Sequence, residues 1–148
     1  GETTLVPDDE RDVVLFEVIG YEDAFEITDG NFKHGQTVTS WGNSAGQNLI
    51  TKKEGEIVGI GQTEIEYTNP TVMGDSGSAV INHEGYVVAV VTRGLKQQRM
   101  NAWLEDRPEM HTRRFGTRID GVKWIKTSRK QILRLGIRTV LLFLNLKI

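Results

Sequence analysis

The chain has 148 residues and no cysteine, and its 18 Lys plus Arg nearly balance its 20 Asp plus Glu, which gives a formal net charge of -2. This length suits one domain, or one and a half small ones, and the lack of cysteine excludes a disulfide scaffold, a thiolate zinc site and a cysteine nucleophile. The charge is uneven along the chain. Residues 1–33 carry ten acidic and two basic side chains, and residues 93–148 carry fourteen basic and four acidic ones.

The predicted elements in the first 120 residues are short strands. Apolar or alternating runs recur there, separated by turns that contain glycine, and residues 83–85 (HEG) connect two of them as a hairpin. Without a β–α–β alternation, this pattern predicts an all-β barrel or sandwich. The expected strands cover residues 13–18, 37–41, 56–61, 63–68, 78–82, 86–92 and 115–119.

Three other segments have different patterns. Residues 95–112 are polar and predict a long loop, and Asp120 precedes a loose apolar stripe that predicts a helix over residues 121–135. The tail 136–148 contains the apolar run 140–146, which is too short to span a bilayer of about 20 helical residues. We expect this run to cover exposed core as a strand or helix, and docking to a membrane surface or a partner is the alternative.

Residues 73–80 (MGDSGSAV) carry the clearest chemical signal. A glycine-rich turn around Ser76 exposes a hydroxyl among backbone N–H groups that can receive a carbonyl oxyanion, and the strand after it would hold the turn rigidly. The same four residues, Gly-Asp-Ser-Gly, also suit an ordinary turn between strands. The α/β-hydrolase nucleophile motif is excluded, because Ser78 stands where that motif needs glycine and a strand follows instead of a helix.

Together with other short motifs, this turn resembles the trypsin-like (chymotrypsin-fold) serine proteases, and the resemblance covers roughly residues 9–130. Each matching motif is short, but all occur in the family's order. Residues 74–77 (GDSG) look like the nucleophile motif, 12–15 (DVVL) like the motif of the catalytic aspartate, 37–46 (TVTSWGNSAG) like the start of the second barrel, 87–94 (VVAVVTRG) like the strand that ends at the specificity pocket, and 115–125 (FGTRIDGVKWI) like the closing strand.

The resemblance implies an all-β, chymotrypsin-like double β-barrel with only a remnant strand of its first barrel. Residues 1–20 would be that remnant, 21–35 the interdomain linker, 36–120 the complete second barrel, 121–135 the C-terminal helix and 136–148 an apolar tail of unknown role. The surface left by the missing half-barrel would favour self-association. The absence of cysteine favours a bacterial extracytoplasmic or a viral origin.

The resemblance also assigns catalytic roles. Ser76 would be the nucleophile, Asp12 would orient the imidazole, and the N–H groups of Gly74 and Ser76 would form the oxyanion hole. Asp75 would be a buried acid that shapes the loop, which in the family often pairs with a new N-terminal amine.

The catalytic histidine is missing from its expected place before Asp12. The chain's histidines are His34, His83 and His111, in a linker, a hairpin turn and a loop, and none is expected to act as the base. Two interpretations remain. Either a separate N-terminal segment or chain supplies the histidine to a serine endopeptidase, or the chain is a catalytically dead module with a binding or structural role. The initial Gly1 indicates processing or a partial sequence.

The specificity pocket of the family would be lined here by six residues that precede the nucleophile or end the later strands. They are Thr71, Met73, Thr92, Arg93, Gly94 and Arg113. No acid occupies the base of this pocket, so a preference for Lys or Arg is not expected. Arg113 would favour an acidic substrate side chain, unless it and Arg114 face solvent.

The remaining features predict no cofactor, metal, nucleic acid or membrane span. The histidines are far apart in sequence, and the acids at residues 8–10 are interpreted as a solvated run instead of a calcium site. The basic C-terminal part has dispersed charges and few aromatic residues, which favours a solvated face over a nucleic-acid surface. A peptide or protein substrate is the expected partner.

Overall fold

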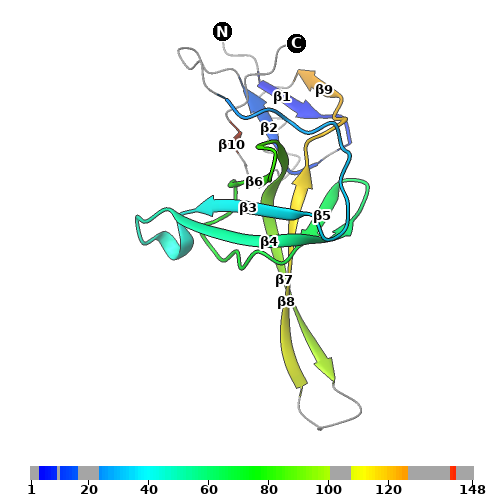
Figure 1. The fold of residues 1–148 in the computed structure, drawn as a ribbon. Helices are drawn as coiled ribbons and strands as arrows, with labels where there is room; N and C mark the ends of the chain where they lie inside the picture. Colours follow the sequence, from blue (N-terminus) through cyan, green and yellow to red (C-terminus); the bar gives the residue numbers. More distant parts are fainter. Residues whose placement is uncertain (1–3, 10, 17–23, 101–107, 127–140, 143–148) are drawn as a thin grey trace.

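The computed structural model describes residues 4–9, 11–16, 24–100, 108–126 and 141–142 (Figure 1). In this part of the chain nearly every regular element is a strand, so the predicted all-β class is confirmed. The elements are β1 (Thr4–Pro7), β2 (Val14–Phe16), β3 (Thr37–Gly42), the 3₁₀ turn η1 (Ser44–Gly46), β4 (Thr51–Ile60), β5 (Glu64–Tyr67), β6 (Ala79–Asn82), β7 (Val87–Met100), β8 (Pro108–Arg118), β9 (Trp124–Lys126) and β10 (Leu141–Leu142).

Six strands close into a barrel in the order β3-β4-β5-β8-β7-β6, with antiparallel neighbours throughout. Alternate side chains of these strands point inward and leave water, which stabilises the barrel by about 1.5–3 kcal/mol for each large apolar side chain. The inward side chains form one core cluster, which consists of Val38, Ile57, Ile65, Tyr67, Val80, Val88, Ala89 and Val91.

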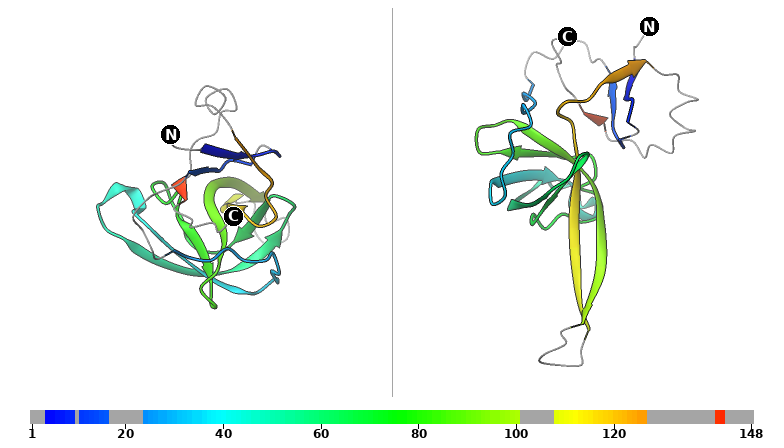
Figure 2. Two further views of the ribbon diagram at one scale, coloured as in Figure 1. Left: turned by 90° about the horizontal axis from the view of Figure 1, so that it is seen from above. Right: turned by 90° about the vertical axis from the view of Figure 1, so that its right-hand side faces the viewer.

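A smaller sheet in the order β10-β2-β1-β9 lies against the barrel (Figure 2). A second apolar cluster joins the smaller sheet to the barrel. Val13, just before β2, packs there against residues of β6 and β7 and against Ile119, which follows β8. The cluster consists of Val13, Ile81, Val87, Val90 and Ile119, with Ile27, Ala79 and Trp124 at its margin. The segment before β2 is therefore fixed to the barrel wall that follows the Gly-Asp-Ser-Gly turn.

The prediction of a long loop over residues 95–112 is wrong. β7 and β8 continue past the barrel as a two-stranded ribbon, paired from Leu95↔Arg113 to Met100↔Pro108, and Figure 2 shows it projecting from the barrel. A ribbon without a core on either face needs no apolar alternation, so a polar sequence can satisfy its backbone as a ladder. Residues 101–107 lie outside the described part.

The C-terminal part also differs from the expected helix over residues 121–135. Trp124–Lys126 form β9, which pairs with β1, and residues 127–135 lie outside the described residues. Trp124 packs against the second cluster, and this tertiary pairing outweighs a weak helical periodicity. Of the tail 136–148, the described pair Leu141–Leu142 forms β10, parallel to β2.

Candidate active site

The loop between β5 and β6 carries the Gly-Asp-Ser-Gly motif and is held by two main-chain hydrogen bonds, one to β7 and one within the turn. The Gly77 N–H donates to the Val91 carbonyl of β7 at 2.9 Å, and the Ser78 N–H donates to the Asp75 carbonyl at 3.0 Å. Gly74 and Gly77 have φ angles of 97° and 91°, in the region that side chains strain to enter. The motif thus folds as a tight turn bonded to the adjacent barrel strand.

Gly74 also meets a close neighbour. A Cβ atom at this position would lie 2.4 Å from the Asn43 carbonyl oxygen, just before η1. The same two segments are bonded through the Ala45 N–H, which donates to the Met73 carbonyl at 2.7 Å. Only glycine fits this contact, so η1 fixes the path of the backbone that leads to Ser76.

Ser76 is exposed at the tip of this turn. Among the described residues, neither its N–H group nor that of Gly74 has a hydrogen-bond partner. Donors that bind an oxyanion must be free of internal acceptors and held in place before the reaction. The turn meets both conditions.

Asp75, next to the exposed Ser76, is itself buried, with 1% of its surface exposed. Its carboxylate pairs with the Lys53 ammonium of β4 and accepts hydrogen bonds from the Ser44 hydroxyl at 3.0 Å and the Val72 N–H at 2.8 Å. Burial alone would raise the pKa of Asp75, but hydrogen bonds from Lys53, Val72 and Ser44 outweigh it and the pKa is lowered. The resemblance implies a buried acid at Asp75, and the cation that pairs with it here is a lysine of the barrel.

Asp12 lies between β1 and β2, beside Val13 of the second cluster. Its Oδ1 atom is buried and has no hydrogen-bond partner among the described residues. A buried carboxylate oxygen without a donor is costly in free energy, and such atoms in native structures are rare. The oxygen is therefore free to accept a hydrogen bond from a group outside the described residues.

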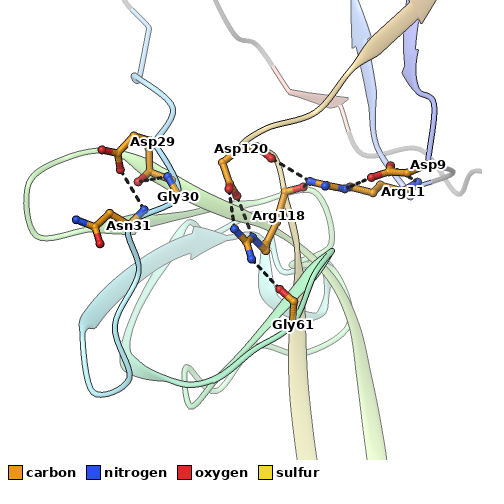
Figure 3. A network of polar contacts seen from close by, with 9 residues as sticks. Asp9, Arg11, Asp29, Gly30, Asn31, Gly61, Arg118 and Asp120 are labelled. Atoms are coloured by element: carbon orange, nitrogen blue, oxygen red, sulfur yellow. Dashed lines mark hydrogen bonds and ion pairs between the residues drawn. The ribbon is translucent and has the colours of Figure 1, made fainter.

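The neighbouring Arg11 anchors this segment to the barrel (Figure 3). Its Nη1 donates to the carbonyls of Arg118 at 2.9 Å and Asp120 at 3.1 Å, and its Nε donates to Asp9 at 2.8 Å. Arg118 in turn forms a bidentate pair with Asp120, at 3.0 and 2.7 Å. A multiply bonded arginine thus ties the backbone before Asp12 to the end of β8.

In the part of the chain that the structure describes, the side chains of His34 and His83 form no hydrogen bond or ion pair with Asp12 or Ser76. His34 lies exposed in the turn before β3, and His83 lies exposed between β6 and β7, with its Nε2 3.7 Å from Glu84. His111 belongs to the projecting ribbon, where its backbone pairs with Gln97.

The residues expected to line a specificity pocket fall into two groups. Thr71 is buried and Met73 is 89% exposed, both on the loop that carries Ser76. On β7, the Thr92 hydroxyl donates to the Phe115 carbonyl at 3.3 Å, and Gly94 is paired with Arg114. Thr71 reaches β8 through its carbonyl, which accepts a hydrogen bond from Arg114, whereas the Met73 carbonyl is bonded to η1.

Arg93 and Arg113 instead lie on the other face of β7 and β8. Arg93 pairs with Glu64 at 2.9 and 2.8 Å, Arg113 pairs with Glu66 at 2.9 and 2.7 Å, and both guanidinium groups stack on Phe115. This pairing does not favour the expectation that Arg113 receives an acidic substrate side chain, because a carboxylate of β5 already occupies the Nε–Nη2 edge of its guanidinium group.

Arg114 is not among the site residues expected from the sequence. Its Nε donates to the Thr71 carbonyl at 2.9 Å, on the loop that carries Ser76. The alternation of side chains along a strand distinguishes Arg114 from Arg113. The core contacts of Gly116 place it on the inward face, which puts Arg114 on that face and Arg113 on the opposite one.

Together, the closed barrel, the second sheet, the exposed serine turn and the aspartate segment define the architecture of a chymotrypsin-like serine peptidase. The family model of the trypsin-like peptidase domain matches residues 1–90, a stretch that includes both Asp12 and Ser76. The chain belongs to this family. A search of curated proteins finds no match.

The described residues contain no group of three or more His, Cys, Asp or Glu side chains arranged to hold a metal ion. In the same part of the chain, no helix has the length and apolar character to cross a membrane.

Proposed function

We propose that this chain carries the nucleophile, the aspartate and the oxyanion donors of a serine endopeptidase. We further propose that the histidine comes from a segment or chain outside residues 1–148. The observation that carries the proposal is the exposed Ser76 on a turn bonded to β7, with the N–H groups of Gly74 and Ser76 free of partners among the described residues. Peptide and protein substrates follow from the family.

In this proposal the reaction is acyl transfer through Ser76. A histidine takes the proton of the Ser76 hydroxyl as the oxygen attacks a peptide carbonyl, and the negative charge that forms on the carbonyl oxygen is bound by the N–H groups of Gly74 and Ser76. The same histidine then gives the proton to the departing amine. Water hydrolyses the resulting ester by the reverse transfer and frees Ser76.

Asp12 supports this role through its unpartnered Oδ1 atom. A carboxylate that accepts the Nδ1–H of an imidazole fixes its tautomer and stabilises the imidazolium that forms. An incoming histidine would satisfy the buried oxygen and gain orientation by the same hydrogen bond. Lys53 and Asp75 hold the turn in shape, and they do not contact the reacting atoms in this proposal.

Labelling with a fluorophosphonate probe, which reacts with activated serines, tests the proposal. The probe is applied to residues 1–148 and to the protein expressed with any coding sequence that precedes Gly1. We expect Ser76 to be labelled strongly in the longer protein and at least about a thousandfold more slowly in the shorter one, because the base carries most of the activation. Ser76→Ala is the control and must remove the label.

No labelling of a folded longer protein would contradict the proposal and would favour the catalytically dead module. Strong labelling of residues 1–148 alone would contradict the claim that the base lies outside them. Wherever a label is found, peptide mapping identifies the modified residue.

A further inference from the structure

Three of the arginines on the barrel parts of β7 and β8 have a carboxylate that accepts two hydrogen bonds from the Nε–Nη2 edge of the guanidinium group. Arg93 pairs with Glu64, Arg113 with Glu66 and Arg118 with Asp120. Arg114 differs, because the recorded partners of its guanidinium group are two main-chain carbonyls, Thr71 O at 2.9 Å and Thr112 O at 3.4 Å. Among the described residues it forms no ion pair.

Arg114 is also half-buried, so its charge is partly removed from water. Partial burial of an unpaired cation is unfavourable, and folded proteins normally compensate it with an anion. Asp75, whose charge acts on Tyr67 as that of Arg114 does, already pairs with Lys53. Arg114 therefore lies beside the serine loop with a positive charge that no described carboxylate neutralises.

The space beside this guanidinium group is open on the neighbouring strand. The residue paired with Arg114 is Gly94, and paired residues point to the same face of a sheet. A Cβ atom at Gly94 would be in van der Waals contact with the Arg113 carbonyl oxygen at 3.7 Å and with Thr112 Cγ2 at 3.8 Å, and it would meet no atom more closely. The glycine thus leaves the side-chain position next to the unpaired cation unfilled on β7.

The charge of Arg114 acts on the hydroxyl of Tyr67 in the barrel interior. Burial raises the pKa of the Tyr67 hydroxyl to about 12, while a hydrogen bond with Thr71 and the charge of Arg114 act to lower it. Tyr67 is paired with Arg114 across β5 and β8. Tyr67 remains a neutral phenol at physiological pH and does not supply a counter-charge.

We infer that Arg114 binds the carboxylate of an acidic substrate side chain, that of the residue whose carbonyl Ser76 attacks. This inference rests on the proposed function, since it makes the junction of the serine loop with β7 and β8 the pocket for that side chain. The guanidinium group is held by Thr71, five residues before Ser76, and Gly94 leaves the space for the ligand. The chemical class of substrate is therefore a peptide cut after Asp or Glu.

The test uses binding of product-like peptides, which needs no catalytic histidine. Acetylated tetrapeptides that differ only in their last residue, Asp, Asn, Leu or Arg, are titrated into ¹⁵N-labelled residues 1–148. Backbone amides of Thr71 and Gly94 report on the site. We expect the Asp peptide to bind about tenfold or more tightly than its Asn isostere, as for a charge-assisted pair.

Four variants assign the effect. Arg114→Gln should remove the preference for Asp over Asn, and Arg114→Lys should retain part of it, since a lysine keeps the charge without the planar donor edge. Gly94→Val should weaken binding of every peptide by filling the space. Arg113→Gln, which removes an arginine one position away, should leave the preference unchanged.

Equal binding of the Asp and Asn peptides would overturn the inference, and so would a preference that survives Arg114→Gln or disappears in Arg113→Gln. Absence of binding by any peptide would overturn it as well. The proposed function stays separately testable in each of these outcomes, because labelling of Ser76 does not depend on the charge of the pocket.

Discussion

Lys53 and Asp75 form a buried ion pair directly behind the serine turn. Replacement of one partner leaves the other charge buried and unpaired, and this lowers the free energy of unfolding strongly. Replacement of both partners by apolar residues would have a much smaller effect. We predict that Lys53→Met lowers the free energy of unfolding by about 3 to 5 kcal/mol, measured by urea denaturation at pH 7. Lys52→Met is the matched control, because Lys52 is exposed and forms only a surface pair with Glu54.

The lowered pKa of Asp75 also sets a pH dependence. A carboxyl whose pKa falls on folding stabilises the folded state above its unfolded pKa, near 3.9, and loses this contribution as the pH falls through the folded pKa. The stability of the wild-type chain should therefore fall more steeply below about pH 4 than that of Asp75→Asn. Parallel slopes for the two proteins would contradict the role assigned to the pair.

Gly74 permits a prediction about the oxyanion turn. Gly74→Ala, at a φ of 97°, places a Cβ atom 2.4 Å from the Asn43 carbonyl oxygen, and Gly85→Ala, at a φ of 89°, meets nothing within 4 Å. Both changes incur the backbone strain of a positive φ, about 1–2 kcal/mol, so their difference isolates the contact. We expect Gly74→Ala to be the more destabilising and to slow labelling of Ser76, whereas equal effects would show that the contact with Asn43 does not shape the turn.

At this scale the sequence identified the serine turn because the residue types of the turn carry its chemistry directly. It did not identify the cation of Asp75, since Lys53 is 22 positions away and only the barrel closure brings it to the turn. It also favoured Arg113 over Arg114. The choice between adjacent residues depends on which face of β8 is inward, and a one-residue difference in register reverses that face.

The projecting part of β7 and β8 is an element with few ties to the rest of the molecule. Beyond Lys96↔Thr112 it pairs only with itself in the described residues, and a two-stranded ribbon alone is marginally stable. We predict that replacement of residues 97–111 by Asn-Gly, a pair suited to a tight hairpin, changes the free energy of unfolding by less than about 1 kcal/mol. Loss of the folded barrel in circular dichroism would show instead that the ribbon is part of its stability.

The strands of the barrel were predictable because inward alternation and glycine turns mark them locally. The ribbon was not, because its sequence lacks apolar alternation and a polar stretch of this length is typical of a loop. β1 and β9 were also missed. Their pairing joins residues more than 100 positions apart, such as Val6 and Ile125, and no local pattern encodes such a partner.

The whole molecule joins its first and last described strands in one sheet, where β10 lies parallel to β2. The sequence had suggested that the apolar tail covers exposed surface, and the pairing with the strand after Asp12 supports that hypothesis for Leu141–Leu142. We predict that deletion of residues 136–148 exposes the edge of β2 and causes self-association, detected as a larger mass in light scattering. Unchanged mass and solubility would contradict this role.

The order of motifs along the chain was enough to predict the class of fold, and the family match over residues 1–90 includes the motifs at residues 12–15, 37–46 and 74–77. The completion of the active site could not be predicted from these residues. Its histidine has no candidate beside Asp12 in the described contacts, and the unpartnered Asp12 oxygen became visible only in the folded structure.

Cleavage of a peptide library shows whether Ser76 is the nucleophile of a peptidase. The protein expressed with any coding sequence that precedes Gly1 is incubated with the library, and its cut sites are compared with those of Ser76→Ala. We predict cuts that disappear in Ser76→Ala, fall by about ten-thousandfold in rate in Asp12→Asn, and lie after acidic residues. A folded protein that makes no cut dependent on Ser76 would contradict the account.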